Sequence, residues 1–267
     1  MGVPFFPQHP VFTAEEFQAF LRSRGATSPS TRKTLLARRQ KAGDIVRIRR
    51  GLYAVVPVGT TAKTAPVDPY LVTACMAADA VLGYHTALEF HGKAHSVFGV
   101  FRYLTNGAAR AVTFRSYRFE PVLFPKALRD GKREMFDVRR MDRSGLPIHV
   151  TSLERTLVDV LDRPDLGGGW EEIWRSLESV EFFDLDKVVE YALLLGNSTT
   201  VAKVGFFLEQ HREVLMVEDA HLQPLKQHKP KQPHYLERSG NRSGRLVADW
   251  NLIVPTELIE RSWSEVP

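Results

Sequence analysis

The clearest chemical signal in the sequence is a set of ten lysines and arginines within residues 1–60. Three acids accompany them, so this segment carries a charge of +7, whereas the whole chain of 267 residues carries +5. The remaining residues are therefore slightly acidic. A positive field confined to one end of a chain is typical of a surface that binds a polyanion. An anionic membrane is a weaker candidate, because no basic amphipathic helix has a broad aromatic face.

Two helices must position the first of these cations. Thr13 and Glu16 form a capping box, which predicts the start of a helix that Gly25 ends. A second helix is expected to begin at Ser30 or Thr31, after Pro29, and to end at Gly43. Lysines and arginines occupy much of the surface of this second helix.

A small hairpin positions the remaining cations. Residues 45–49 alternate apolar and basic side chains, which is typical of a half-buried strand. A tight turn at Arg50 and Gly51 leads to a returning strand over residues 52–55. Two helices followed by a basic hairpin is the order of elements in a winged helix-turn-helix.

This order of elements predicts a role for each polar side chain. The first residues of the second helix reach base edges in the major groove, whereas later helix residues and the hairpin grip phosphates or enter the minor groove. The DNA-contacting residues predicted on this basis are Ser30, Thr31, Arg32, Lys33, Arg38, Arg39, Lys41, Arg47, Arg49 and Arg50. Any one of these cations could be a solvated surface charge. The helix and the hairpin are both basic while the rest of the chain is not, and this favours DNA binding.

A segment rich in Pro, Gly and Thr, residues 56–68, predicts a domain boundary. We expect a winged helix-turn-helix domain over residues 1–58 and a larger mixed domain over residues 69–267. The larger domain should contain apolar helices, then short strands, then a helical C-terminal part. The predicted fold class is α+β.

Other chemistry has less support in the larger domain. His85 and Glu89 are helical neighbours that could share a metal ion, but His91 lies on a different face and no further ligand follows at a useful spacing. Cys75 is the single cysteine and lies in an apolar run, without the setting of a nucleophile. We expect structural roles for these residues. We expect the protein to have no catalytic residues and to bind neither a metal nor a cofactor.

A basic, proline-rich loop is expected at residues 226–234. Most such loops are solvated surface, and a second phosphate contact is the alternative interpretation.

The sequence also predicts a location in the cell. No stretch reaches the ~20 consecutive apolar residues that a membrane helix needs, and the first ten residues lack the basic region of a signal peptide. A single cysteine suits a reducing compartment. We expect a cytoplasmic protein.

Three segments resemble the AbiEi-like antitoxins of type IV (AbiE-type) toxin–antitoxin systems. The most specific is LLARRQKAGDIVRIRRGLYAV at residues 35–55; the others lie at residues 81–92 and 145–159. The resemblance implies a transcriptional repressor that autoregulates its operon and counteracts a nucleotidyltransferase-like toxin. Members of the family often carry a further helix before the one that opens at Thr13. Few residues precede it here, three of them proline, so we expect a trimmed module.

These observations lead to a principal hypothesis and two alternatives. The principal hypothesis is a DNA-binding transcriptional repressor and antitoxin without enzymatic activity, whose partners are the double-stranded DNA of its own operator and a nucleotidyltransferase-like toxin. The first alternative is a nucleic-acid-processing enzyme, either a nuclease or a nucleotide-handling domain, recruited by the DNA-binding arm. The second is a C-terminal domain that neutralises a toxin by contact alone. Metal-dependent turnover of plasmid or RNA would distinguish the enzyme from the repressor.

Overall fold

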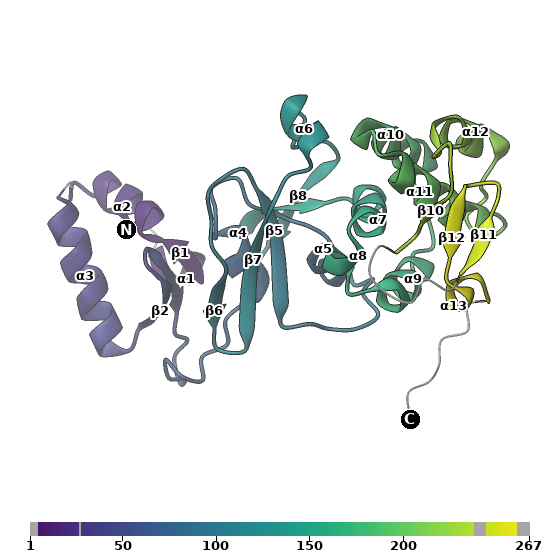
Figure 1. The fold of residues 1–267 in the computed structure, drawn as a ribbon. Helices are drawn as coiled ribbons and strands as arrows, with labels where there is room; N and C mark the ends of the chain where they lie inside the picture. Colours follow the sequence, from purple (N-terminus) through teal and green to yellow (C-terminus); the bar gives the residue numbers. More distant parts are fainter. Residues whose placement is uncertain (1–4, 27, 238–243, 261–267) are drawn as a thin grey trace. The chain divides into compact units, whose positions relative to one another are not determined.

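The computed structural model describes residues 5–26, 28–237 and 244–260. Within these residues the chain forms helices α1–α13 and strands β1–β12 (Figure 1), which confirms the predicted α+β class. The chain folds into two compact units. The first unit comprises residues 1–82, 99–122 and 140–149, and the second comprises residues 83–98, 123–139 and 150–267. The expected boundary between residues 58 and 69 stays a prediction.

The N-terminal module has the predicted helix, helix and hairpin. Its elements are α1 (Phe5–Gln8), β1 (Val11–Thr13), α2 (Ala14–Ser23), α3 (Pro29–Ala42), β2 (Ile45–Arg49) and β3 (Leu52–Val55). The three strands form an antiparallel sheet in the order β1-β3-β2, with α2 and α3 packed beside it (Figure 1). The sequence interpretation missed β1 and the single turn α1.

Local sequence sets the ends of the two main helices. Thr13 Oγ1 accepts a hydrogen bond from Glu16 N at 3.1 Å and the Glu16 carboxylate accepts one from Thr13 N at 2.6 Å, so the predicted capping box is confirmed. Helix α3 begins at Pro29 rather than Ser30, because proline suits the first helical position. Gly43 ends α3 as predicted, in the left-handed conformation with φ 82°.

Aromatic rings dominate the core of the module. The ring centroid of Phe5 lies 5.2 Å from that of Phe12 and 5.2 Å from that of Phe17, and all three side chains are buried. Leu36 and Ile45 complete this core from α3 and β2. A single helical turn, α1, thus precedes the helix that opens at Thr13, and its residue Phe5 packs in the core.

The first unit continues beyond the module with α4 (Pro69–Ala74), β4 (Val81–Leu82), β5 (Val100–Thr105), β6 (Val112–Phe114) and most of β7 (Tyr117–Leu123). These strands belong to a six-stranded sheet in the order β6-β7-β5-β4-β9-β8. Its last two strands, β8 (Val138–Arg143) and β9 (Leu146–Thr151), divide between the units. The expected linker at residues 56–68 contains no helix or strand. Arg115 donates hydrogen bonds to the carbonyls of Ala62 and Ala65 within it.

The second unit is mainly helical and includes the predicted helical C-terminal part of the chain. Its helices are α5 (His85–Phe90), α6 (Lys126–Asp130), α7 (Leu153–Asp162), α8 (Pro164–Gly167), α9 (Trp170–Glu178), α10 (Leu185–Leu195), α11 (Ser198–Gln210), α12 (Asp219–His228) and α13 (Thr256–Glu260). A small sheet in the order β10-β12-β11 lies among them, formed by β10 (His234–Tyr235), β11 (Arg245–Val247) and β12 (Leu252–Val254). Trp174 and Trp250 are fully buried and anchor this part of the core.

Candidate nucleic-acid interface

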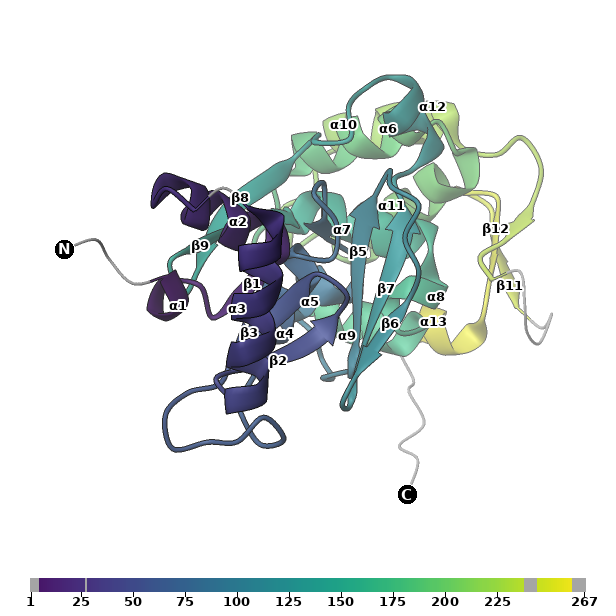
Figure 2. The same cartoon turned by 90° about the vertical axis from the view of Figure 1, so that its left-hand side faces the viewer.

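Helix α3 is exposed along almost its whole length. Of its 14 residues only Leu36 is buried, while Arg32 and Leu35 are half-buried. A surface helix normally buries a broad apolar stripe, so a helix with a single buried residue has most of its surface available to a ligand. Figure 2 shows α3 facing the viewer, with β2 and β3 behind it.

The outermost side of α3 carries small side chains between basic ones. Ser30, Thr34, Ala37 and Lys41 are exposed and repeat at helical spacing along this side. Small side chains let a helix approach the floor of a groove closely. Sequence reasoning missed Thr34 and Ala37 because it followed charge, although their helical spacing would have identified them.

A groove of about 650 Å³ separates α3 from the hairpin. Its lining includes Arg32, Lys33 and Gln40 of α3, and the hairpin contributes Arg47, Arg49, Arg50, Gly51 and Tyr53. Glu15 is the acid among the lining residues. Five cations against one acid make the groove strongly positive, which suits a phosphate backbone. Gln40 was also missed, although glutamine is a good reader of adenine.

Half of the ten predicted DNA-contacting residues are exposed cations available for binding. Within the part of the chain that the structure describes, none of them has a hydrogen bond, ion pair or ring contact. They are Lys33, Arg38, Lys41, Arg47 and Arg50. We call this set the open cations.

Two predicted residues on α3 are held by the fold itself. Arg32 is half-buried and its Nη1 lies 3.4 Å from the carbonyl oxygen of Ala14, a long hydrogen bond. Arg39 pairs with Asp44 at 2.7 Å. Each arginine must release its present partner before it can bind a phosphate.

Arg49 differs most from expectation. The strand pattern predicted it on the exposed face of the hairpin, but it is half-buried and its Nη2 donates to the carbonyl oxygen of Met76 at 2.6 Å. The register of β2 against β3 shifts between Arg47 and Arg49. This irregularity breaks the alternation of the strand, so Ile48 turns into the core and Arg49 turns away from Arg47.

The two hydroxyl residues at the start of α3 also differ from each other. The Oγ of Ser30 is hydrogen-bonded to the Oγ of Ser28 at 2.7 Å, within the cap of the helix. Thr31 is exposed, and no partner for it occurs among the described residues. Of the four predicted base readers, Thr31 and Lys33 are therefore the most accessible.

The candidate metal ligands of the second unit are engaged by other groups of the protein. His85 is fully buried, with Nε2 at 3.0 Å from Glu172 and Nδ1 at 3.4 Å from Glu89. His91 Nε2 donates to the carbonyl oxygen of Thr151 at 2.8 Å, and burial lowers the pKa of His91. Among the described residues no group of His, Cys, Asp or Glu is arranged to hold a metal ion.

Burial also affects the single cysteine, which lies in the first unit. It raises the pKa of the Cys75 thiol to about 12. The thiol is therefore protonated at neutral pH and is a poor nucleophile.

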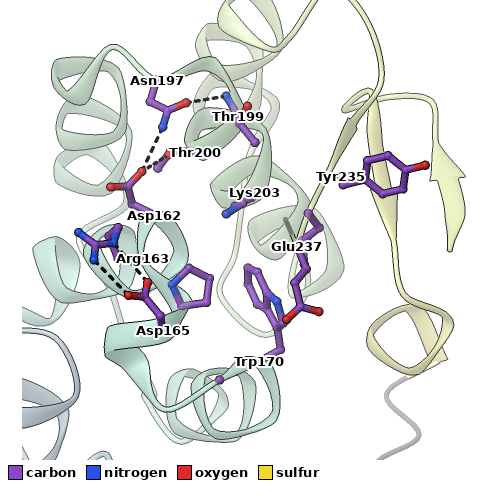
Figure 3. Close-up of a pocket in the computed structure, with 13 residues that line it drawn as sticks. Asp162, Arg163, Asp165, Trp170, Asn197, Thr199, Thr200, Lys203, Tyr235 and Glu237 are labelled. Carbon is purple, nitrogen blue, oxygen red and sulfur yellow. Dashed lines mark hydrogen bonds and ion pairs between the residues drawn. The ribbon is translucent and has the colours of Figure 1, made fainter. Parts of the chain in front are cut away.

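A second cavity, of about 460 Å³, lies within the second unit (Figure 3). Asp162 accepts hydrogen bonds from Asn197 and Thr200 at its edge, and Arg163 pairs with Asp165 at 3.1 Å. Lys203 is 7% exposed. Its ammonium group donates to the carbonyl oxygen of Leu161 at 3.1 Å and lies 5.2 Å from the centroid of the Trp170 ring. The cations of this cavity are thus engaged by the fold.

The basic segment at residues 226–234 is also partly engaged. It begins as the last turn of α12, where Lys226 pairs with Glu209 at 3.1 Å. Lys229 donates to the carbonyl oxygen of Asp249 at 2.6 Å. Lys231 is exposed and has no partner among the described residues, so it alone of these three lysines suits a second phosphate contact.

Among the described residues no helix is both long and apolar enough to cross a bilayer.

Comparison with known proteins bears on the module most directly. Residues 4–56 match the family model described as "Transcriptional regulator, AbiEi antitoxin". The predicted resemblance is confirmed over these residues, about a fifth of the chain, and the match supports a transcriptional regulator or antitoxin. The similar segments at residues 81–92 and 145–159 lie outside the match.

One solved structure is similar over most of the chain. It is the crystal structure of the RV2827C protein from Mycobacterium tuberculosis, with a TM-score of 0.60 and 18% sequence identity, covering 91% of this chain and 86% of that chain. At this identity the likeness is one of fold. No curated protein sequence matches the chain.

Proposed function

We propose that this protein is a DNA-binding transcriptional repressor and the antitoxin of a type IV toxin–antitoxin system. The observation that carries the proposal is the state of α3 and the hairpin. Helix α3 buries one residue of 14, and the open cations have no partner within the described protein. Charges that contribute nothing to the fold are available for an external polyanion.

The geometry suggests how the module meets duplex DNA. The outer side of α3, with Thr34 and Ala37 at its centre, enters the major groove. Thr31 and Lys33 reach base edges near the start of the helix. Arg47 and Arg50 on the hairpin contact the flanking backbone across the groove of about 650 Å³.

The family match supports the finer parts of the proposal. It describes a transcriptional regulator and antitoxin, so we assign DNA binding to the N-terminal module and the counteraction of a nucleotidyltransferase-like toxin to the larger part of the chain. Binding to its own operator would make the protein an autoregulator that acts in the cytoplasm without enzymatic turnover.

Operator preference tests the DNA-binding part. Fluorescence anisotropy would compare the full chain on duplex DNA from upstream of its own gene with the same bases scrambled. We expect tighter binding to the natural sequence, and we expect Lys33→Ala to shrink that preference, because loss of one base contact costs about 1–3 kcal/mol on the preferred sequence. Lys126→Ala is the matched control, since Lys126 is an exposed cation of the second unit. Equal binding to both duplexes by the wild-type chain would contradict the proposal.

Co-expression tests the antitoxin part. The chain would be expressed together with a nucleotidyltransferase encoded beside it, and growth would be compared with expression of that enzyme alone. We expect the chain to restore growth. If growth arrest persists at equal expression, the antitoxin assignment is wrong while the DNA-binding assignment stands.

A further inference from the structure

Another basic cavity lies in the first unit, outside the family match apart from one residue. It measures about 340 Å³ and is lined by Arg49, Met76, Ala77, Tyr103, residues 107–110 and Val112. Its lining contains two arginines, Arg49 and Arg110, and no acid. The cavity is therefore positive and belongs entirely to the first unit.

Arg49 links this cavity to the groove beside α3. Its side chain lines both. One nitrogen of the guanidinium, Nη2, is fixed on Met76, whereas Nε is buried and has no partner among the described residues. The hairpin arginine thus retains an unused donor where the two cavities meet.

The loop that carries Arg110 is anchored at its start. Thr105 Oγ1 donates to Asp79 at 2.5 Å and Asn106 N donates to the same carboxylate at 2.7 Å. Gly107 N then donates to Thr105 Oγ1 at 3.0 Å. This anchoring positions the following residues, and Arg110 at the end of the loop is exposed, with no partner in the described part of the chain.

We propose that this cavity, bounded by Arg49 and Arg110, binds a backbone phosphate of the same DNA duplex, so that the DNA surface continues beyond the winged module onto the β5–β6 loop. The inference rests on the proposed DNA-binding function and adds a contact to it. A phosphodiester fits because it is anionic and accepts several hydrogen bonds from arginine, and because the cavity offers no carboxylate to repel it.

Salt dependence of DNA binding by the full chain tests this site. Each phosphate neutralised by a cation adds about 0.9 to the slope of log affinity against log salt concentration. We expect Arg110→Ala to make this slope shallower by about 0.9 and to weaken binding to the natural and the scrambled duplex alike. Arg110→Lys should restore part of the slope, since lysine keeps the charge.

Lys63→Ala is the matched control. Lys63 is an exposed cation of the first unit that lines neither cavity, so its loss measures the general effect of one charge. Circular dichroism would show that each variant is folded. Because the Arg110 side chain makes no hydrogen bond, ion pair or ring contact in the described protein, we expect its removal to leave the fold intact.

Two results separate this site from the proposed function. The first result is that Arg110→Ala and Lys63→Ala give the same salt slope, while Arg50→Ala still makes the slope shallower. In that case the phosphate site is wrong and the DNA-binding module stands. If Arg50→Ala is also without effect, the proposed function fails together with the site.

Discussion

Basic side chains in two regions of this molecule have opposite surroundings. On α3 and the hairpin the five open cations have no partner among the described residues. In the second unit Arg163 and Lys203 line a cavity of about 460 Å³, yet each is held by the protein. The difference shows that the number of charges around a cavity does not identify a binding site. What identifies it is whether the fold already uses those charges.

Arg155 is the extreme case of a cation that the fold uses. It is fully buried, and its Nη1 donates to the carbonyl oxygens of Glu134 and Phe136 at 2.8 and 2.7 Å. Its Nε lies 3.4 Å from Asp159, whose other carboxylate oxygen accepts a hydrogen bond from the Tyr191 hydroxyl at 2.6 Å. This arginine therefore connects α7, α10 and the segment before β8.

Removing this buried cation should have the largest effect on stability. We expect Arg155→Ala to lower the free energy of unfolding by about 3–5 kcal/mol, because it leaves Asp159 buried without its counter-charge. Urea unfolding followed by tryptophan fluorescence would measure it. The control is Arg212→Ala, whose pair with Asp219 is exposed and should contribute less than about 1 kcal/mol. If the two changes lowered the free energy of unfolding equally, burial of the cation would not determine its contribution to stability.

The next largest effect is expected in the module. Leu36 is the one buried residue of α3, so Leu36→Ala should destabilise the packing of this helix by about 2–5 kcal/mol. Hydrogen exchange of the amides over residues 30–42 would report the opening of the helix. Leu35→Ala is the comparison, and it should have a smaller effect because Leu35 is only half-buried. Unchanged exchange in Leu36→Ala would mean that α3 is not held by this contact.

The buried pair also predicts a pH effect. Burial raises the pKa of Asp159 to about 6, against the opposing influence of Arg155. The folded protein then binds this proton more tightly than the unfolded chain does, so the contribution of Asp159 to stability falls as the pH rises from about 4 to about 6. The difference in unfolding free energy between wild type and Asp159→Asn should therefore decrease across this range. A difference that increases with pH would show that Arg155 dominates and depresses the pKa.

Removing a single exposed charge should give the smallest effect. Its influence on DNA binding should differ most clearly between the N-terminal module and the second unit. Arg50→Ala should make the salt dependence of DNA binding shallower by about 0.9, since Arg50 is one of the open cations. Arg163→Ala removes the same charge from a residue that is paired with Asp165, and should leave the dependence unchanged. Salt titrations of both variants on one duplex would check this. If both variants made the salt dependence equally shallow, DNA binding would depend on the net charge of the protein and not on the open cations.

The local features of the module could be predicted from the sequence. The capping box at Thr13, the left-handed Gly43 and the basic hairpin each depend on residues within a few positions of one another. The sequence did not predict strand β1, because its three residues directly precede α2 and include the N-cap of that helix. They form a strand only by pairing with β3.

The state of each cation could not be predicted in the same way. Arg32 contacts a carbonyl 18 positions away, and Arg49 contacts one 27 positions away. These partners depend on tertiary packing and on the irregular register of β2, which charge and periodicity do not encode. The sequence therefore located the basic surface, while the structure separated its open cations from its engaged ones.

The most direct test of the account is the salt dependence of DNA binding by the full wild-type chain. The four open cations assigned to phosphates (Arg38, Lys41, Arg47 and Arg50) predict a slope of log affinity against log salt concentration near −3.6 on duplex DNA, and the proposed Arg110 contact would bring it near −4.5. The combined variant Arg38→Ala, Arg47→Ala and Arg50→Ala should reduce the magnitude of this slope by about 2.7 while remaining folded. A wild-type slope near zero, or a combined variant that binds like wild type, would contradict the claim that α3 and the hairpin form a DNA-binding surface.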